Sequence, residues 1–270
     1  MYRIYSFIYR YFFLFIIIIL LSFLFIFTLG LIMGSFLNSL SYRLPYQLNY
    51  LEEHKDFSQL NIAEPRSFCP NCSHALSYYS LVPIFSYLMQ RGKCLSCDKK
   101  ISLEYPFYEL LTGSLFLFSF LLKGFIVTDL FIIFLVILIS RIDYRFFKIP
   151  IFLNILVLSS SIVKAYLISN WSLLLLGFLI SGVGLIIIKL VTDKIIKKES
   201  LGMGDILLIS FVCSYFGPFS IPPILFISSF LGIIYIFLQK KIDFDKQIAF
   251  APFISIATIL YLFFLNQIAI

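Results

Sequence analysis

The sequence predicts an all-α polytopic membrane protein with about eight transmembrane helices and one small loop domain outside the membrane. Three observations support this fold class. Of the 270 residues, 61% are hydrophobic and only 13% are charged, a balance that soluble domains of this size do not have. The apolar residues gather in runs long enough to cross a bilayer. One long segment without such a run, residues 43–104, separates the first apolar run from the others.

The apolar runs are expected to form the membrane helices. The first, residues 11–32, is too long for the hydrophobic region of a signal peptide and lacks a small-residue cleavage site. Seven further runs lie at residues 105–122, 125–140, 149–168, 171–190, 206–216, 220–238 and 248–268. The expected organisation is a tail and first helix over residues 1–42, the loop domain over 43–104 and a seven-helix membrane domain over 105–270.

Lys and Arg residues are distributed unevenly between the two sets of alternating loops. One set consists of the loop domain and the loops near 141–148, 189–198 and 240–246, and it holds 17 of the 21 basic residues, whereas the other set holds four. Positively charged loops stay in the cytoplasm, so we expect the loop domain inside and both termini outside. The net charge of +7 then reflects orientation and contact with membrane lipid, and it gives no support for nucleic-acid binding.

Four of the five cysteines fall in the loop domain as two C-x-x-C pairs, Cys69 with Cys72 and Cys94 with Cys97. The pairs are separated by 21 residues, just past the usual spacing of four-thiolate sites in which a tetrahedral zinc ion fixes a small fold. Two disulfides are the alternative, but disulfides rarely persist in the reducing cytoplasm, where the topology places this loop. We therefore expect a structural zinc ion in a cytoplasmic loop domain between helices 1 and 2.

The stretch LGMGDILL (201–208) places a carboxylate, Asp205, at the start of an apolar run. A carboxylate at membrane depth is costly, so Asp205 is a candidate for function. Gly202 and Gly204 lack Cβ atoms, which allows another chain or a substrate backbone to approach closely. Other carboxylates lie in charged loop segments and need no special role: Asp193, Asp243 and Asp245.

Asp143 is the expected partner of Asp205. It lies where the predicted third span reaches the cytoplasm, so the alternation of spans puts both carboxylates on one membrane face, 62 residues apart in sequence. Two neighbouring carboxylates share a proton, which lets one act as a general base on water while the other polarises a carbonyl, as in aspartic peptidases. A structural ion pair is the alternative for Asp143, because three bases lie nearby in the sequence: Arg141, Arg145 and Lys148.

Several motifs in a fixed order resemble those of one family. They are GSFLNSLSYRLP (34–45), the two C-x-x-C pairs with LVPIFSYLMQRGKC (81–94), ISLEYPFYEL (101–110), Asp143 followed by Ile149-Pro150, GMGD (202–205) and AFAPFIS (249–255). The set resembles bacterial prepilin peptidases, the type IV leader peptidases with a G-x-G-D signature. The chain departs from the family pattern at Ile151, where a polar residue is common, and at Ala251, where glycine is usual. Neither departure touches the aspartates or the cysteines.

The resemblance implies an enzyme of the inner (plasma) membrane that cuts the basic leader from prepilins or pseudopilins at the cytoplasmic face. It implies Asp143 and Asp205 as the catalytic pair, Gly202 and Gly204 in support, and the four cysteines as zinc ligands. Many members then N-methylate the new N-terminal residue with S-adenosylmethionine, an activity attributed to the N-terminal half. Residues there could contact substrate or cofactor, although helix packing or interfacial anchoring is the alternative. The candidates are Asn38, Arg43 and Glu109.

Three other functions agree with part of the sequence. A presenilin-type intramembrane protease shares G-x-G-D, but it is expected to carry Tyr-Asp within a span, whereas this chain has Asp143-Tyr144 at a span end. A transporter that uses the two aspartates as ion sites would predict inverted repeats or broken midplane helices, and the sequence shows neither clearly. A non-enzymatic zinc-loop scaffold for a secretion machine is the third.

Overall fold

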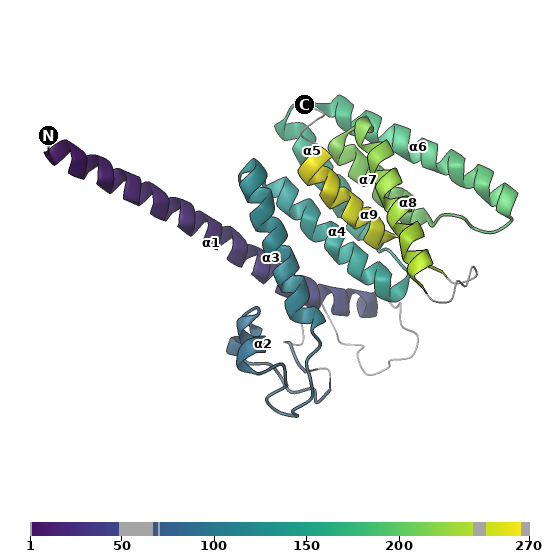
Figure 1. Cartoon of the computed structure of the whole chain (residues 1–270). Helices are drawn as coiled ribbons and strands as arrows, with labels where there is room; N and C mark the ends of the chain where they lie inside the picture. The colour runs from purple at the N-terminus through teal and green to yellow at the C-terminus, as the bar shows by residue number, and fades with distance from the viewer. Residues whose placement is uncertain (1, 49–66, 70, 240–246, 266–270) are drawn as a thin grey trace. The chain divides into compact units, whose positions relative to one another are not determined.

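The computed structural model describes residues 2–48, 67–69, 71–239 and 247–265. These residues divide into two compact units, of which the first contains α1, α2 and α3 and the second contains α4 to α9 (Figure 1). Apart from two isolated β-bridges, the described residues form helices, turns and loops. Asp243, Asp245 and the predicted basic loop at 240–246 lie outside the described residues.

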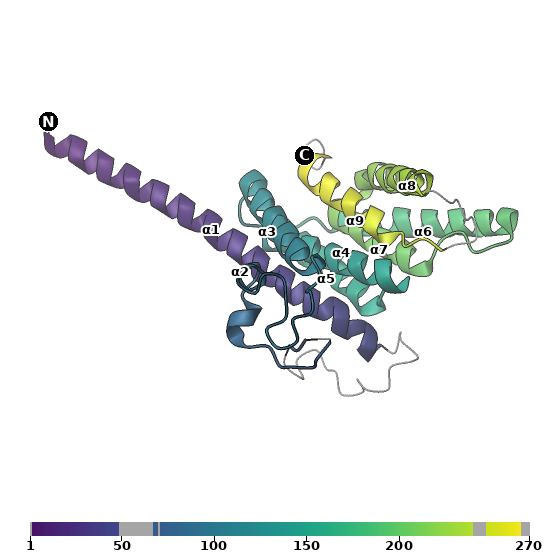
Figure 2. The ribbon, with the colours of Figure 1, turned by 60° about the horizontal axis from the view of Figure 1, so that its bottom comes forward.

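The first unit is built on two long helices that pack side by side, α1 (Tyr2–Gln47) and α3 (Glu104–Lys123) (Figures 1 and 2). Glycines allow their backbones to approach closely: a Cβ atom on Gly30 would lie 2.7 Å from the Gly113 Cα atom. Between the two helices the chain forms a loop with the short helices η2 (Tyr78–Leu81) and α2 (Phe85–Met89). With 46 residues, α1 is about 69 Å long and continues well past the predicted end of the first span.

The second unit surrounds two buried helices, α4 (Val127–Phe146) and α7 (Met203–Phe216). Helix α7 packs against its neighbours α5 and α6, and α4 packs against α5 and α9. The remaining elements of this unit are α5 (Ile151–Leu167), α6 (Trp171–Ile196), η3 (Pro218–Ser220), α8 (Ile221–Leu238), α9 (Ala251–Leu260) and the π-helical turn η4 (Tyr261–Leu265). Helix α7 has only 14 residues, about 21 Å of helix. Because it is buried among its neighbours, it can be a central element of the unit at this length.

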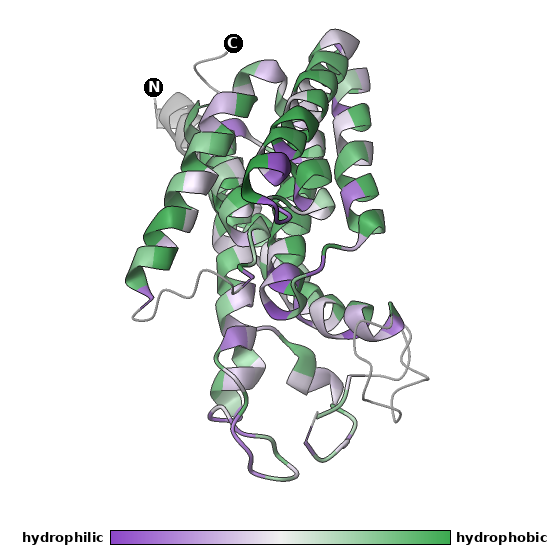
Figure 3. Cartoon of the chain, turned by 90° about the vertical axis from the view of Figure 1, so that its right-hand side faces the viewer, coloured by the Kyte–Doolittle hydropathy of each residue, from purple (hydrophilic) through white to green (hydrophobic). Residues whose placement is uncertain are grey.

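Each of the eight predicted apolar runs lies largely on a helix, as far as the described residues reach. Within the described ranges, four helices are long and apolar enough to cross a membrane: Phe13–Gln47, Glu104–Lys123, Trp171–Ile196 and Pro218–Leu238. The other apolar helices are shorter or, like α4, carry several charges. Hydrophobic residues also cover the outward faces of the helices, as expected for contact with lipid (Figure 3). The protein is therefore an all-α membrane protein, while the number of eight crossings stays a prediction.

One buried polar cluster was missed by the sequence analysis. Asp129, in the first turn of α4, accepts a hydrogen bond from the Tyr215 hydroxyl near the end of α7, and the Thr128 hydroxyl oxygen lies 3.1 Å from the same Tyr215 oxygen. The Lys164 ammonium lies 3.9 Å from the centre of the Tyr215 ring. These contacts join α4, α5 and α7 at the ends opposite to Asp143 and Asp205, because Asp143 lies 14 positions after Asp129 along α4.

The contact between α6 and α7 depends on Gly177. A Cβ atom there would lie 2.3 Å from the Cys213 carbonyl oxygen, so Gly177→Ala must displace one helix backbone from the other. We expect this substitution to lower the free energy of unfolding by about 1–3 kcal/mol, measured as reduced thermal stability in detergent. Gly184→Ala is the matched control on the same helix, because its Cβ would meet nothing within 4 Å. Equal stabilities of the two variants would contradict this packing.

Candidate active site

Asp143 is held in place by the start of a helix far away in the sequence. It lies one turn before the end of α4 and its side chain is buried, with 5% of the residue exposed. Its Oδ2 atom accepts a hydrogen bond of 3.1 Å from the backbone N–H of Ala251, the first residue of α9. The expectation that the departures at Ile151 and Ala251 do not touch the aspartates was therefore wrong, because Ile151 also lines the cavity beside them. A helix N-terminus presents free N–H groups and a partial positive charge, so it suits a carboxylate.

Asp205 lies in the first turn of α7, whose N-cap residue is Gly202. A Cβ atom on Gly202 would lie 3.0 Å from the Asp205 Oδ2 atom, and one on Gly204 would lie 3.2 Å from the Cβ atom of Ile149. Gly202 therefore leaves room for the carboxylate, and Gly204 lets the segment after α4 approach α7. The Oδ1 atom of Asp205 is buried and makes no hydrogen bond with any described residue.

Both aspartates line one cavity of about 310 Å³. Its other lining residues are Phe147, Lys148, Ile149, Ile151, Gly202 and Gly204. The two carboxylates are close enough to interact electrostatically. The structure thus brings together the two acidic residues that the sequence placed on one membrane face, with the glycines of GMGD beside them. A cavity of this size can hold water and part of an extended peptide.

The alternative of an ion pair for Asp143 has no support in the described residues. Asp143 makes no ion pair there with Arg141, Arg145 or Lys148, and it accepts its hydrogen bond from the Ala251 backbone N–H. A carboxylate held by backbone N–H groups rather than by a base keeps its second oxygen available for chemistry in the cavity.

Asn154 supports the same site from α5. It is fully buried, and its Nδ2 atom donates a hydrogen bond of 3.3 Å to the Gly204 carbonyl oxygen. Further along α5, the Ser161 hydroxyl donates to the Phe211 carbonyl oxygen at 3.1 Å, so α5 holds α7 at two points. The sequence analysis did not select Asn154, although an amide inside an otherwise apolar helix was a usable signal.

In the first unit the four loop cysteines meet. Their sulfur atoms all lie within 4.8 Å of one another, and the pairs Cys69–Cys97 and Cys72–Cys94 are 4.0 Å apart. Four sulfurs bound to a tetrahedral zinc ion at about 2.3 Å lie about 3.8 Å from one another, so the cluster fits such an ion. A disulfide needs an S–S distance of about 2.0 Å, and all four cysteines are free. The structure therefore does not contain the two disulfides of the alternative interpretation.

The two cysteine pairs form matching turns. After each pair a residue adopts a left-handed conformation, Ser73 with φ 55° and Asp98 with φ 54°, and a β-bridge closes each turn. Hydrogen bonds from the Lys99 backbone and the Asn71 side chain lower the pKa of the Cys97 thiol to about 6. The thiolate form, which is the one that binds a metal, is therefore favoured at Cys97 at neutral pH.

The candidate contact residues of the N-terminal half lie in or near the contact between α1 and α3. The Asn38 amide donates to the Tyr105 carbonyl oxygen at 3.0 Å, and a Glu109 carboxylate oxygen accepts from the Ile84 backbone N–H at 2.7 Å. Glu109 thus joins α3 to the start of α2. Arg43 is buried at the end of α1. Within the first unit, Asn38 and Glu109 thus each connect two elements of the chain.

Comparison with known proteins gives consistent matches along the chain. Residues 28–122 match the model of the Bacterial Peptidase A24 N-terminal domain, and residues 130–237 match that of the Type IV leader peptidase family. An Escherichia coli protein named "Type 4 prepilin-like proteins leader peptide-processing enzyme" is 33% identical over 226 residues, which cover 78% of this chain and 83% of the relative. The chain belongs to the type IV leader peptidase family.

Other members of the leader peptidase family are similar over comparable lengths. The "Prepilin leader peptidase/N-methyltransferase" of Bacillus subtilis is 33% identical and covers 86% of this chain and 90% of its own. The protein of the same name from Vibrio cholerae is 31% identical, with 78% of this chain and 84% of the relative covered. No solved structure matches this chain significantly. The region matched to the leader peptidase model contains Asp143 and Asp205, and the N-terminal match contains the four cysteines.

Proposed function

We propose that the protein is a membrane aspartic endopeptidase that cleaves the leader peptide of type IV prepilins or pseudopilins, with Asp143 and Asp205 as its catalytic pair. The single observation that carries this proposal is that both carboxylates line one cavity in the part of the chain that matches the leader peptidase model. The orphaned Oδ1 atom of Asp205 and the backbone hydrogen bond to Asp143 support different roles for the two groups.

The proposed reaction uses one proton shared by the pair. One carboxylate, ionised, takes a proton from a water molecule in the cavity, and the water oxygen attacks the carbonyl carbon of the scissile peptide bond. The other carboxyl group, protonated, donates a hydrogen bond to the carbonyl oxygen as negative charge develops there. When the tetrahedral intermediate collapses, the C–N bond breaks and the amine leaves with a proton from the pair.

The proposed setting is the cytoplasmic face of the inner membrane. The excess of Lys and Arg in the loops on the side of Asp143 and Asp205 supports a cytoplasmic active site and loop domain, with both termini outside. The apolar helix of a prepilin would lie in the bilayer beside the enzyme, and its basic leader would lie in the cytoplasm. Eight crossings agree with this orientation, because an even number returns the chain to the side on which it started.

A zinc ion is the proposed occupant of the cysteine cluster, since four thiolates in tetrahedral spacing favour zinc. Such a closed site leaves no open coordination position, so the ion would fold the loop and take no part in peptide cleavage. Residues Cys69, Cys72, Cys94 and Cys97 would hold it.

We also propose that the enzyme methylates the new N-terminal amine with S-adenosylmethionine, because the relatives from Bacillus subtilis and Vibrio cholerae carry N-methyltransferase in their names. S-adenosylmethionine would supply the methyl group as an electrophile. The hydrogen bonds of Asn38 and Glu109 within the first unit give no support for a direct contact of these two residues with that cofactor.

The experiment that tests both activities is incubation of membranes containing the protein with a tagged prepilin and S-adenosylmethionine. Mass spectrometry of the substrate's N-terminus is expected to find a chain without its leader and carrying one added methyl group. Omitting S-adenosylmethionine should leave cleavage intact and remove the methyl group. Recovery of only full-length prepilin, from membranes shown to contain the folded protein, would contradict the peptidase proposal.

A further inference from the structure

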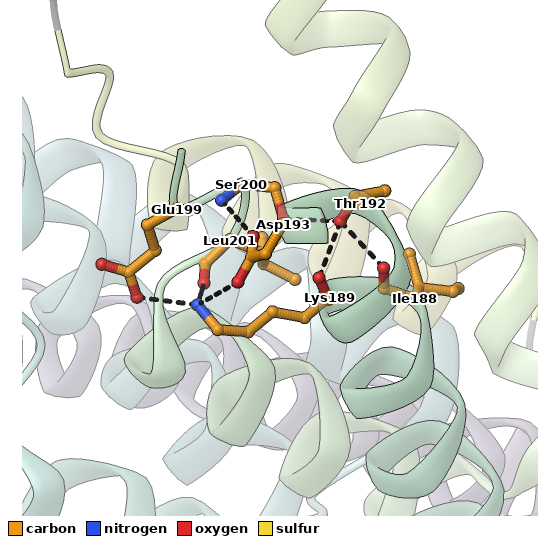
Figure 4. A network of polar contacts seen from close by, with 7 residues as sticks. All are labelled: Ile188, Lys189, Thr192, Asp193, Glu199, Ser200 and Leu201. Atoms are coloured by element: carbon orange, nitrogen blue, oxygen red, sulfur yellow. Dashed lines mark hydrogen bonds and ion pairs between the residues drawn. The ribbon is translucent and has the colours of Figure 1, made fainter. Parts of the chain in front are cut away.

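Lys189 connects the end of α6 with the segment that leads to Asp205 (Figure 4). Its ammonium group donates hydrogen bonds to the Glu199 carboxylate at 2.7 Å and to the Leu201 carbonyl oxygen at 2.5 Å. It also forms an ion pair of 3.6 Å with Asp193, one turn further along α6. The lysine thus contacts its own helix and both ends of the segment Glu199–Leu201.

A second layer of hydrogen bonds holds the middle of the same segment (Figure 4). The Asp193 Oδ1 atom accepts a bond of 2.7 Å from the Ser200 backbone N–H, and the Ser200 hydroxyl lies 2.7 Å from the Thr192 hydroxyl. The sequence analysis treated Asp193 as an ordinary loop carboxylate, and this was wrong. Asp193 lies inside α6 and fastens the next loop to that helix.

This network ends directly at the candidate active site. The chain leaves α6 through the left-handed residue Lys197, passes through the network and reaches Gly202, the N-cap of α7. That N-cap has no side-chain hydrogen bond of its own. Side chains of two other helices therefore hold the start of α7. Lys189 of α6 donates a hydrogen bond to the Leu201 carbonyl oxygen, and Asn154 of α5 donates one to the Gly204 carbonyl oxygen.

Ordinary surface charge pairing does not account for this arrangement. The Lys189 side chain is only 15% exposed, although its partner Glu199 is 72% exposed. Exposed ion pairs add little to global stability, because solvent screens them. One of the three partners of Lys189 is an uncharged backbone oxygen, and that contact fixes the path of the loop. The contacts of Lys189 therefore fix the position of the segment before Asp205.

We propose that Lys189 is a positioning residue for the peptidase reaction: by holding Leu201 it sets the place of Asp205 relative to Asp143. This inference rests on the proposed catalytic pair. A small displacement of a reacting group can reduce the rate of an enzyme by about 10²-fold without changing how tightly the substrate binds. Loss of Lys189 should therefore affect kcat far more than KM.

The test measures kcat and KM of prepilin cleavage by the purified full chain. Lys189→Met is expected to lower kcat by about 10-fold or more with KM within about twofold, and Lys189→Arg, which keeps the charge and several donors, should restore most of the rate. Lys194→Met is the matched control, because Lys194 is exposed on the same helix and makes no hydrogen bond or ion pair within the described ranges.

A second measurement is independent of activity. Limited trypsin digestion after Lys197 and Lys198, followed by mass spectrometry, should be faster in Lys189→Met than in Lys194→Met, since the loop is no longer fastened. Equal kcat and equal digestion rates for these two variants would overturn the positioning role. If Lys189→Met fails to fold, Lys189→Gln, whose side chain is shorter and uncharged, decides instead: an unchanged kcat overturns the proposal and a reduced one supports it.

Asp205→Asn, assayed in parallel, separates this inference from the proposed function. An inactive Asp205→Asn together with a fully active Lys189→Met would leave the catalytic pair standing and remove only the role of Lys189. An Asp205→Asn variant as active as the native protein would remove both.

Discussion

Asp143→Asn and Asp205→Asn are each expected to reduce the rate of leader cleavage by about 10²–10⁴-fold, the usual contribution of a general acid or base. Asparagine has nearly the same shape as aspartate but cannot exchange a proton with water or with the leaving amine. Because both side chains line the same cavity, either substitution breaks the proposed shared-proton pair. The loss should persist at every pH at which the protein stays folded.

The measurement is a time course of prepilin cleavage by membranes with matched amounts of each variant. Glu104→Gln is the control, since it makes the same carboxylate-to-amide change at an exposed position at the start of α3. Its rate should equal that of the native protein. Native rates for both aspartate variants would eliminate the aspartic mechanism, and loss at only one position would mean that the two carboxylates do not act as a pair.

The second large effect is expected at the cysteine cluster. Cys94→Ser should reduce bound zinc from about one ion per chain to almost none, because a tetrahedral structural site does not tolerate the loss of one thiolate. The loop between η2 and α3 has little buried apolar surface of its own, since neither η2 nor α2 contains a buried residue. It should therefore depend on the metal for its fold.

Metal analysis of the purified protein and protease digestion of the loop together test this prediction. Cys213→Ser is the matched control, because Cys213 lies buried in α7 and is not part of the cysteine cluster, so the same substitution there should leave the zinc in place. A Cys94→Ser protein that retains a full equivalent of zinc would show that the four sulfurs do not form the site.

The parts of the fold that depend on hydropathy were predictable from the sequence. The apolar runs lie on helices as far as the described residues reach, and the expectation that Asp143 and Asp205 lie close together, which came from counting alternate spans, agrees with their shared cavity. The cysteine cluster followed from spacing, because two C-x-x-C pairs at this separation are typical of a site that binds one metal ion. In each case a local pattern and one physical rule were enough.

The contacts that hold the site could not be predicted in this way. The Ala251 N–H reaches Asp143 only because α9 packs beside α4, and Lys189 reaches Leu201 only because of the path of the loop after α6. The partnership of Asp129 with Tyr215 likewise joins residues 86 positions apart. Such pairs are set by tertiary packing, which cannot be predicted from the local patterns of a single sequence.

The hydrogen bond from Ala251 to Asp143 also bears on how the protein is made. The donor lies 108 residues after the acceptor, so a growing chain can contain both aspartates while the amide that orients one of them is still inside the ribosome. Asp143 therefore acquires this hydrogen bond only once α9 has formed and packed beside α4.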